Sequence, residues 1–335
     1  MKKKIGINGL GRIGRMIIRS IFENNYKTIK IKHINSRSNI ETACNLIKYD
    51  SIHGLFRSKI RHDKNFIYIN NMKILYTQKS KIDEIQWKKS SSDIVLECTG
   101  KFNSKEKLIP HLINGAKKVL VSAPCKDSDK MIVFGVNHNQ IKSNDKIISA
   151  GSCTTNCLAP IVSVLHKKFS LKSAFMTTIH SYTSDQRLLD NSHKDPRRGR
   201  SAAQSIVPTS TGASKSIGDI IPELKGKLAG IAMRVPTPNV SLIELVFNSK
   251  KTITSKIINN ILENSSKKEL KGIMRVCSEK LVSIDFNHDR HSAIIDLSLT
   301  NVIGKKMGKV TAWYDNEWGF SNRMCDIVEY LHKIS

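Results

Sequence analysis

The first part of the chain alternates short apolar runs with amphipathic ones. The run Met16–Phe22 has the spacing of a helix with one buried face. Short runs rich in apolar residues predict strands over Lys4–Asn8, Ile29–Asn35, Ser92–Gly100, Lys117–Pro124, Met131–Val136 and Lys146–Ala150. Of these, Ser92–Gly100 and Lys117–Pro124 are typical of strands buried on both faces of a parallel sheet. Strands that alternate with helices predict an α/β domain of the Rossmann type over residues 1–150.

After residue 150 the pattern changes to longer runs in which apolar and polar residues alternate. Such alternation is typical of a mixed or antiparallel sheet with one covered face, and it appears in Ala174–His180, Val240–Phe247 and Ala293–Leu297. Between these strands, Ser181–Gln204 is polar and basic and lacks apolar periodicity, which in a compact domain indicates a functional loop. The run Phe320–Ile334 predicts a closing helix. We therefore expect an α+β domain over residues 151–318.

Length and composition favour a globular protein of two domains. The chain has 335 residues, 39% of them hydrophobic, and no stretch approaches the roughly 20 apolar residues of a membrane span. The basic start Lys2–Lys4 leads directly into a strand and not into the apolar region of a signal peptide, so we expect a cytoplasmic protein without a membrane partner. Seven cysteines without paired spacing predict reduced thiols and no metal site.

The formal net charge of +27 would suit a polyanionic partner such as nucleic acid. The lysines, however, are dispersed along the whole chain and are not combined with an aromatic recognition motif. We interpret the charge mainly as a compositional bias on a solvated surface. Nucleic-acid binding is then at most nonspecific.

A glycine pattern near the N-terminus predicts a dinucleotide site. Gly9, Gly11 and Gly14 have GxGxxG spacing after a strand and before a helix. In this pattern the first glycine permits a tight turn, the second lets the backbone approach a pyrophosphate, and the third lets helix and strand pack closely. The backbone N–H groups of Gly11, Arg12 and Ile13 should then face the phosphates.

The second strand lacks the carboxylate that usually binds the adenosine ribose of NAD. After Asn35 the chain continues with Ser36 and Arg37, which would tolerate or bind the 2′-phosphate of NADP instead. The alternative is that Arg37 is only a solvated loop residue. Thr99 and Ser122 follow two buried strands at the edge where an open α/β sheet binds its ligand, and they complete the expected coenzyme site.

A small, hydroxylated run around Cys153 points to a nucleophile. Ser152 or Thr154 can cap a helix that continues through Leu158–Leu165, and the positive end of the helix dipole should lower the pKa of the Cys153 thiol. The alternative is a buried structural cysteine, which is the commoner fate of an unpaired thiol. The polar neighbours favour the nucleophile.

Six motifs occur in the order found in one enzyme family: Asn8–Gly14, Ser152–Asn156, His180–Thr183, Pro208–Gly212, Arg234–Asn239 and Trp313–Gly319. Over essentially its whole length the sequence resembles the phosphorylating glyceraldehyde-3-phosphate dehydrogenases. The resemblance implies a coenzyme domain of residues 1–150 with the helix 319–335 packing back on it, and a catalytic domain of residues 151–318. It also implies a homotetramer.

The resemblance assigns roles to individual residues. Cys153 would attack the aldehyde of glyceraldehyde 3-phosphate, and His180 would act as its base. Thr183 and Arg234 would hold the phosphate of the substrate, and Asn316 would orient the nicotinamide of NAD or NADP. Incoming inorganic phosphate would be bound by Ser152, Thr154, Thr211 and Gly212. Asp185 replaces a threonine that many members carry, and an aspartate beside a phosphate requires an offsetting arginine.

Two alternatives and one departure remain open at this stage. Erythrose-4-phosphate dehydrogenases share the cysteine and histidine, whereas a polyanion-binding protein could have kept the fold. The departure concerns Asn191–Ser192, which replaces the Leu-Pro pair that similar NAD-restricted enzymes place near the adenosine ribose. This is a second hint at use of NADP.

Overall fold

The computed structural model describes residues 2–334, which form two compact units. The first unit is Met1–Ser152 with Phe320–Ser335, and the second is Cys153–Gly319. All seven cysteines are free thiols. Within residues 2–334, no helix combines the length and the apolar character that crossing a membrane requires.

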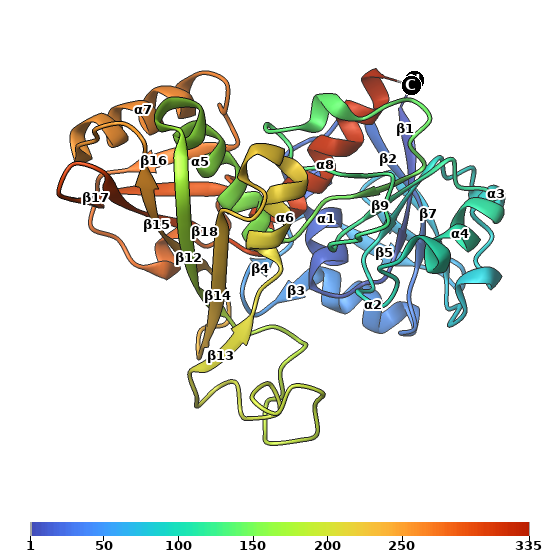
Figure 1. Ribbon diagram of the computed structural model, residues 1–335. Coiled ribbons are helices and arrows are strands. Elements are labelled where there is room, and N and C mark those ends of the chain that lie inside the picture. The colour runs from blue at the N-terminus through green and yellow to red at the C-terminus, as the bar shows by residue number, and fades with distance from the viewer. Residues whose placement is uncertain (1, 335) are drawn as a thin grey trace. The chain divides into compact units, whose positions relative to one another are not determined.

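The first unit is built on a nine-stranded sheet (Figure 1). Its strands, in sheet order, are β10 (Lys130–Met131), β11 (Ile147–Ser149), β9 (Lys118–Val121), β8 (Ile94–Glu97), β1 (Lys3–Asn8), β2 (Ile29–Asn35), β7 (Met72–Thr77), β6 (Phe66–Ile69) and β5 (Ile60–His62). The pairs from β10 to β7 are parallel, and β6 and β5 add an antiparallel edge. This is the predicted Rossmann-type sheet.

Helices cover both faces of this sheet, which is why the central strands β8 and β9 consist mainly of apolar residues. Figure 1 shows α1 (Arg12–Glu23) and α2 (Ile40–Lys48) on one side and α4 (Lys105–Ile113) on the other. All four residues of β8 and all four of β9 are buried. From β1 the chain adds strands outward through β2, and it then returns to add β8 on the other side of β1. The order in which the parallel strands are added therefore reverses between β1 and β8. Ligands bind open α/β sheets at such a reversal.

The predicted strand over Met131–Val136 is wrong beyond Met131. The ladder to β11 ends there, and the Asn137 side chain takes over the backbone groups. Its Oδ1 accepts from the N–H of Val133 at 2.8 Å, and its Nδ2 donates to the carbonyl of Met131 at 3.0 Å. Asparagine competes with sheet ladders in this way, and an apolar pattern does not reveal it.

The last helix, α8 (Trp318–Lys333), contacts the first unit through side chains. Asn322 Oδ1 accepts from Ser20 at 2.9 Å, Asp326 accepts from Tyr26 at 2.9 Å, and Glu329 accepts from Thr28 at 2.5 Å. These bonds lie beside a buried apolar face that includes Ile327, Val328 and Leu331. The C-terminal helix therefore packs on the coenzyme unit.

The second unit contains a seven-stranded mixed sheet. In sheet order its strands are β13 (Val207–Ser210), β14 (Leu228–Val235), β12 (Leu171–Ser181), β15 (Ser241–Ser249), β18 (Met307–Tyr314), β17 (Ala293–Ile303) and β16 (Met274–Cys277). Most pairs are antiparallel, whereas β12 with β14 and β16 with β17 are parallel. The helices α5 (Cys153–Phe169), α6 (Ala213–Ile220) and α7 (Ser255–Lys267) pack on it. The alternation predicted for β15 is confirmed, because Ile243, Leu245 and Phe247 are buried.

Candidate active site

A pocket of about 310 Å³ opens at the reversal point of the first sheet. Its walls come from the carboxyl ends of β1, β2, β7 and β8 and the loops that follow them: Asn8–Gly11, Asn35–Ser38, Lys79, Ser80, Ile82, Ile85, Cys98, Thr99, Lys101 and Phe102. None of these lining residues, all of which fall within residues 2–334, is acidic, and three of them are cationic. The pocket therefore suits an anionic ligand.

The glycine loop has the geometry that a dinucleotide requires. Gly9 has φ +99°, a conformation that L side chains rarely adopt. A Cβ added to Gly14 would lie 2.0 Å from the carbonyl oxygen of Gly9, so any side chain there would force helix α1 away from β1. Gly11 directly precedes α1, whose first N–H groups can accept a pyrophosphate. The residues present therefore fit a nicotinamide dinucleotide.

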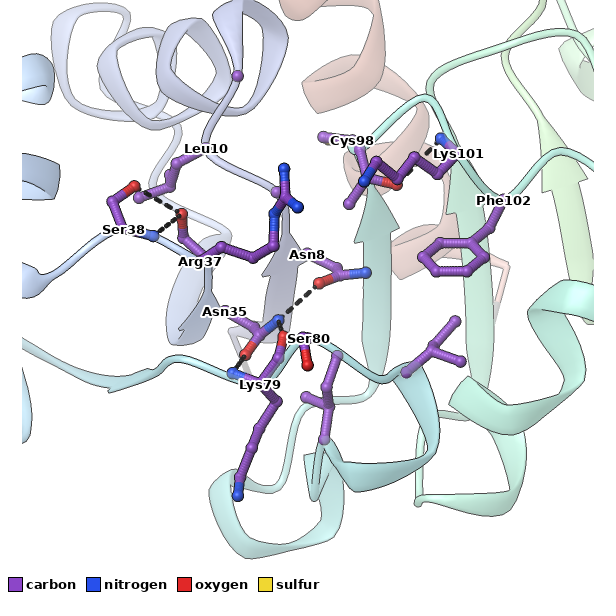
Figure 2. A pocket seen from close by; sticks show the side chains of 16 residues that line it. Asn8, Leu10, Asn35, Arg37, Ser38, Lys79, Ser80, Cys98, Lys101 and Phe102 are labelled. Carbon is purple, nitrogen blue, oxygen red and sulfur yellow. Dashed lines mark hydrogen bonds between the residues drawn. The ribbon is translucent and has the colours of Figure 1, made fainter.

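The predicted coenzyme residues divide into two groups. Gly11, Ser36, Arg37 and Thr99 line the pocket, and Figure 2 shows the side chains of Arg37 and Lys101 pointing toward one another across it. Arg12, Ile13, Ser122 and Asn316 are not among its lining residues.

The side chains of Arg12 and Ser122 have other partners. The Arg12 guanidinium donates to both carboxylate oxygens of Asp50, at 2.5 and 3.0 Å. Ser122 Oγ donates to the carbonyl of Glu97 at 2.9 Å. Arg12 and Ile13 can therefore contact a phosphate only through their backbone N–H groups at the start of α1.

The second unit brings the predicted nucleophile and base together. Cys153 is the first residue of α5, so Ser152 takes the cap position and Thr154 lies inside the helix. His180 lies near the end of β12 and is 3% exposed. The distance from Cys153 Sγ to His180 Nε2 is 3.6 Å. A helix start and a strand end, 27 residues apart in sequence, thus form one thiol–imidazole pair.

Two groups contact the other ring nitrogen of His180. The carbonyl oxygen of Ser181 lies 2.6 Å from Nδ1, and Arg234 Nη1 lies 2.9 Å from it and 3.0 Å from that oxygen. The carbonyl can only accept and the guanidinium can only donate, so the two contacts call for opposite tautomers. We assign the proton to Nδ1, because this keeps the 2.6 Å bond to Ser181 while Arg234 donates to the same carbonyl, and it leaves the lone pair of Nε2 facing the sulfur. Burial and then the charge of Arg234 lower the pKa of His180 to about 3, so the imidazole is neutral at physiological pH.

The sequence predicted a lowered pKa for Cys153, and this prediction is wrong. Burial raises the pKa of the thiol above its ordinary value, and the charge of Arg234 and hydrogen bonds from Thr154 only partly oppose this rise. Desolvation disfavours the thiolate more than the helix start favours it. The free site therefore holds a neutral thiol beside a neutral base.

The other residues predicted to bind phosphate lie at the ends of strands and helices of the second unit. Gly212 occupies the cap position of α6, and Thr211 Oγ1 accepts from the N–H of Ala213 at 3.2 Å. Thr183 is partly buried just beyond the end of β12. Arg198, which the sequence analysis did not select, donates to Asp185 at 2.5 Å and to the carbonyl of Ser210 at 3.3 Å.

Arg198 is the offsetting arginine that Asp185 requires. With His193 Nε2 also 3.6 Å from Asp185, the carboxylate is neutralised within the loop. The only sequence signal for this pairing was the basic character of the loop 181–204.

Thr154 and Asn316 are held by buried hydroxyl groups. Thr154 is 4% exposed, and its Oγ1 lies 2.9 Å from the hydroxyl of the buried Tyr314, so its side chain faces the interior and only its backbone is placed to meet an anion. Asn316 Oδ1 accepts from Ser181 Oγ at 2.8 Å and from Ser241 Oγ at 3.0 Å. These two donors fix the orientation of the Asn316 carboxamide.

A Rossmann unit with a dinucleotide cradle, in one chain with a cysteine–histidine pair that an arginine contacts, is typical of a nicotinamide-dependent oxidoreductase with a thiol nucleophile. Sequence models described as the NAD binding domain and the C-terminal domain of glyceraldehyde 3-phosphate dehydrogenase match residues 3–105 and 152–316. The chain belongs to the glyceraldehyde-3-phosphate dehydrogenase family.

Curated relatives agree with this assignment. The chromosomal glyceraldehyde-3-phosphate dehydrogenase of Cupriavidus necator is 48% identical over 328 residues, 97% of each chain. The glyceraldehyde-3-phosphate dehydrogenase of Geobacillus stearothermophilus is 45% identical over 332 residues, 99% of this chain and 98% of the relative. That of Cereibacter sphaeroides is 46% identical over 326 residues, 97% of each chain. These matches lend no support to the erythrose-4-phosphate or polyanion-binding alternatives.

Proposed function

We propose that this protein catalyses the reversible, phosphorylating oxidation of glyceraldehyde 3-phosphate. The pairing of Cys153 Sγ with His180 Nε2 carries the proposal. As the sulfur attacks the aldehyde carbon, the thiol proton passes to Nε2 and from there to the carbonyl oxygen, which becomes the hydroxyl of a thiohemiacetal. The bound coenzyme supplies a hydride acceptor. Loss of the hydroxyl proton to His180 then leaves a thioester on Cys153, which inorganic phosphate cleaves to 1,3-bisphosphoglycerate.

The anion-binding groups support the phosphorylating form of the reaction. Arg234 and Thr183 are proposed to hold the phosphate of the substrate. Ser152, Thr211, Gly212 and the backbone of Thr154 are proposed to receive inorganic phosphate. The test measures reduced coenzyme formed from glyceraldehyde 3-phosphate with and without inorganic phosphate. Turnover that does not depend on phosphate would refute the phosphorylating assignment.

Arg198 yields a prediction at this anion site. Replacing it in Arg198→Ala leaves the charge of Asp185 without its closest partner, so we expect the KM for phosphate to rise roughly ten-fold or more. Adding Asp185→Asn removes the repulsion and should recover most of that loss. Steady-state kinetics of both variants and of Asp185→Asn alone check this. If the double variant raised the KM for phosphate by the product of the two single effects, Arg198 and Asp185 would act independently, and the prediction would be contradicted.

The coenzyme pocket supports use of NADP as well as NAD. Neither Arg37 nor Lys101 forms an ion pair with another residue in the range 2–334, so both cations remain available to a phosphate. Ser36, at the end of β2, provides a hydroxyl where NAD-restricted enzymes carry an acid. We therefore propose dual use with a preference for NADP.

The matched variants Ser36→Asp and Arg37→Ala test this preference. An aspartate at position 36 would repel a 2′-phosphate and accept hydrogen bonds from the ribose, whereas loss of Arg37 removes a charge-assisted bond. We expect the ratio of kcat/KM with NADP to kcat/KM with NAD to fall by about 10- to 100-fold in each. Equal effects on both coenzymes, or a strong preference of the parent protein for NAD, would contradict the proposal.

A homotetramer is proposed as the assembly. The loop 181–204 exposes Leu188 and Leu189, each 72% exposed, and Ile206 just beyond it is 69% exposed. Large apolar side chains gathered on one polar loop favour burial against another copy of the chain. Light scattering should give the mass of four chains, and a monomeric mass would contradict this assembly.

A further inference from the structure

Four polar side chains, three of them buried and the fourth, Thr77, half-buried, form a row across the carboxyl ends of neighbouring strands in the first unit. Glu97, Asn8, Asn35 and Thr77 end β8, β1, β2 and β7, which are adjacent in the sheet. Asn8 Nδ2 donates to Glu97 Oε2 at 2.7 Å, Asn35 Nδ2 donates to Asn8 Oδ1 at 2.9 Å, and Thr77 Oγ1 donates to Asn35 Oδ1 at 2.9 Å. Each of these three bonds is donated in the direction of Glu97.

Glu97 is a buried carboxylate held entirely by neutral donors. It is 1% exposed, and its Oε1 accepts from the N–H and the hydroxyl of Thr99, at 2.7 and 2.5 Å. His111 Nε2 lies 3.0 Å from Oε2, while His111 Nδ1 receives the indole N–H of Trp87 at 2.8 Å. Because an indole can only donate, Nδ1 carries the lone pair and Nε2 carries the proton. The Glu97–His111 contact is therefore a hydrogen bond from a neutral imidazole and not an ion pair.

The row connects opposite walls of the coenzyme pocket. At one end Glu97 holds the backbone and side chain of Thr99, which lines the pocket. At the other end Asn35 accepts from the N–H of Lys79 at 2.9 Å and donates to its carbonyl at 3.0 Å. Figure 2 shows Asn8 and Asn35 bonded to each other between these walls.

We propose that Glu97 is a positioning residue for coenzyme binding, which acts through Asn8 and Thr99 on the walls of the pocket. This inference depends only on the coenzyme site and not on the aldehyde chemistry proposed above. Hydrogen bonds that point one way along a chain reinforce one another, and Glu97 is the acceptor at which two such chains end. A change at Glu97 therefore affects side chains that line the pocket although Glu97 itself does not line it.

The variant Glu97→Gln tests the proposal with little change in shape. A glutamine brings an NH2 group to an acceptor position that donors already face, so either Asn8 or Thr99 loses its bond. We expect the dissociation constants of NAD and NADP, measured by equilibrium binding without aldehyde, to rise at least about ten-fold. We expect kcat at saturating coenzyme and the rate of Cys153 alkylation without coenzyme to stay within about two-fold.

Three further variants separate positioning from general stability. Glu106→Gln removes an exposed acid on α4 and should bind coenzyme like the parent protein. His111→Gln can accept from Trp87 and donate to Glu97, so it should retain affinity, whereas His111→Leu should weaken it. Thr77→Val should weaken binding less than Glu97→Gln, and the double variant should show less than the product of the two effects, because both act through one row.

Coenzyme affinity unchanged in Glu97→Gln would overturn the proposal. So would a loss of affinity accompanied by an equal change in Cys153 alkylation, because that would indicate a general disturbance. Failure of the aldehyde reaction in the parent protein would refute the proposed function while leaving this binding experiment interpretable.

Discussion

Cys153→Ser should lower oxidation of glyceraldehyde 3-phosphate by on the order of 10⁴-fold or more. An alcohol is a far weaker acid than a thiol, and burial already raises the pKa of the group at this position. His180 Nε2 would therefore have to take its proton from a much weaker acid before attack on the aldehyde. The measurement is the absorbance of reduced coenzyme at saturating aldehyde, phosphate and coenzyme.

A matched cysteine makes this result specific. Cys277 lies on β16 of the same unit, is 6% exposed, and its Sγ contacts the carbonyl of Glu279 at 3.6 Å. Because a serine hydroxyl can make the same contact, Cys277→Ser should retain activity within a few-fold. Undiminished oxidation by Cys153→Ser would overturn the covalent mechanism.

His180→Asn should lower kcat by about 10²- to 10⁴-fold and should also slow alkylation of Cys153 at pH 7. The pKa of Cys153 is raised, so little thiolate exists at neutral pH and attack depends on a neighbouring proton acceptor. His180 Nε2 is that acceptor at 3.6 Å. Because the pKa of His180 is lowered to about 3, the imidazole stays neutral as the pH falls from 9 to 5. It becomes protonated, and stops acting as a base, only near its pKa of about 3.

The pH dependence of alkylation distinguishes the explanations. In the parent protein the rate should already be measurable at pH 7 and should rise as pH approaches the raised thiol pKa. In His180→Asn the rate at pH 7 should fall about ten-fold or more and should recover at high pH, where hydroxide removes the proton. His62→Asn, an exposed site on β5, is the control. An unchanged rate at pH 7 in His180→Asn would refute the pairing.

The periodicity of apolar residues predicted most of the architecture. Strands buried on both faces must be apolar at successive positions, so β8 and β9 could be predicted from their apolar residues and the small residues that follow them. The error at Met131–Val136 arose because a side-chain amide, and not a strand, satisfies the backbone there. Local competition of this kind leaves no trace in an apolar pattern.

The candidate site was less readable than the fold. Glu97 ends a buried strand and looks like an ordinary strand boundary, and Arg198 lies among several arginines of a basic loop. Glu97 contacts His111, 14 residues away in sequence, and Arg198 contacts Asp185, 13 residues away. Only folding brings these partners within hydrogen-bonding distance. Thr154 was a plausible phosphate ligand by position, but the structure directs its hydroxyl toward Tyr314.

The sequence by itself determined the sheet-and-helix order, the dinucleotide glycines, and the presence of a cysteine and a histidine in motifs of one family. These features depend on residue type and on short spacings, both of which can be read directly from the sequence. Only the tertiary structure decided which charges meet, how donors are directed around Glu97, and how far desolvation shifts Cys153 and His180 from their ordinary pKa values. Those quantities depend on three-dimensional distance and on exclusion of water, and neither is a property of neighbouring residues along the chain.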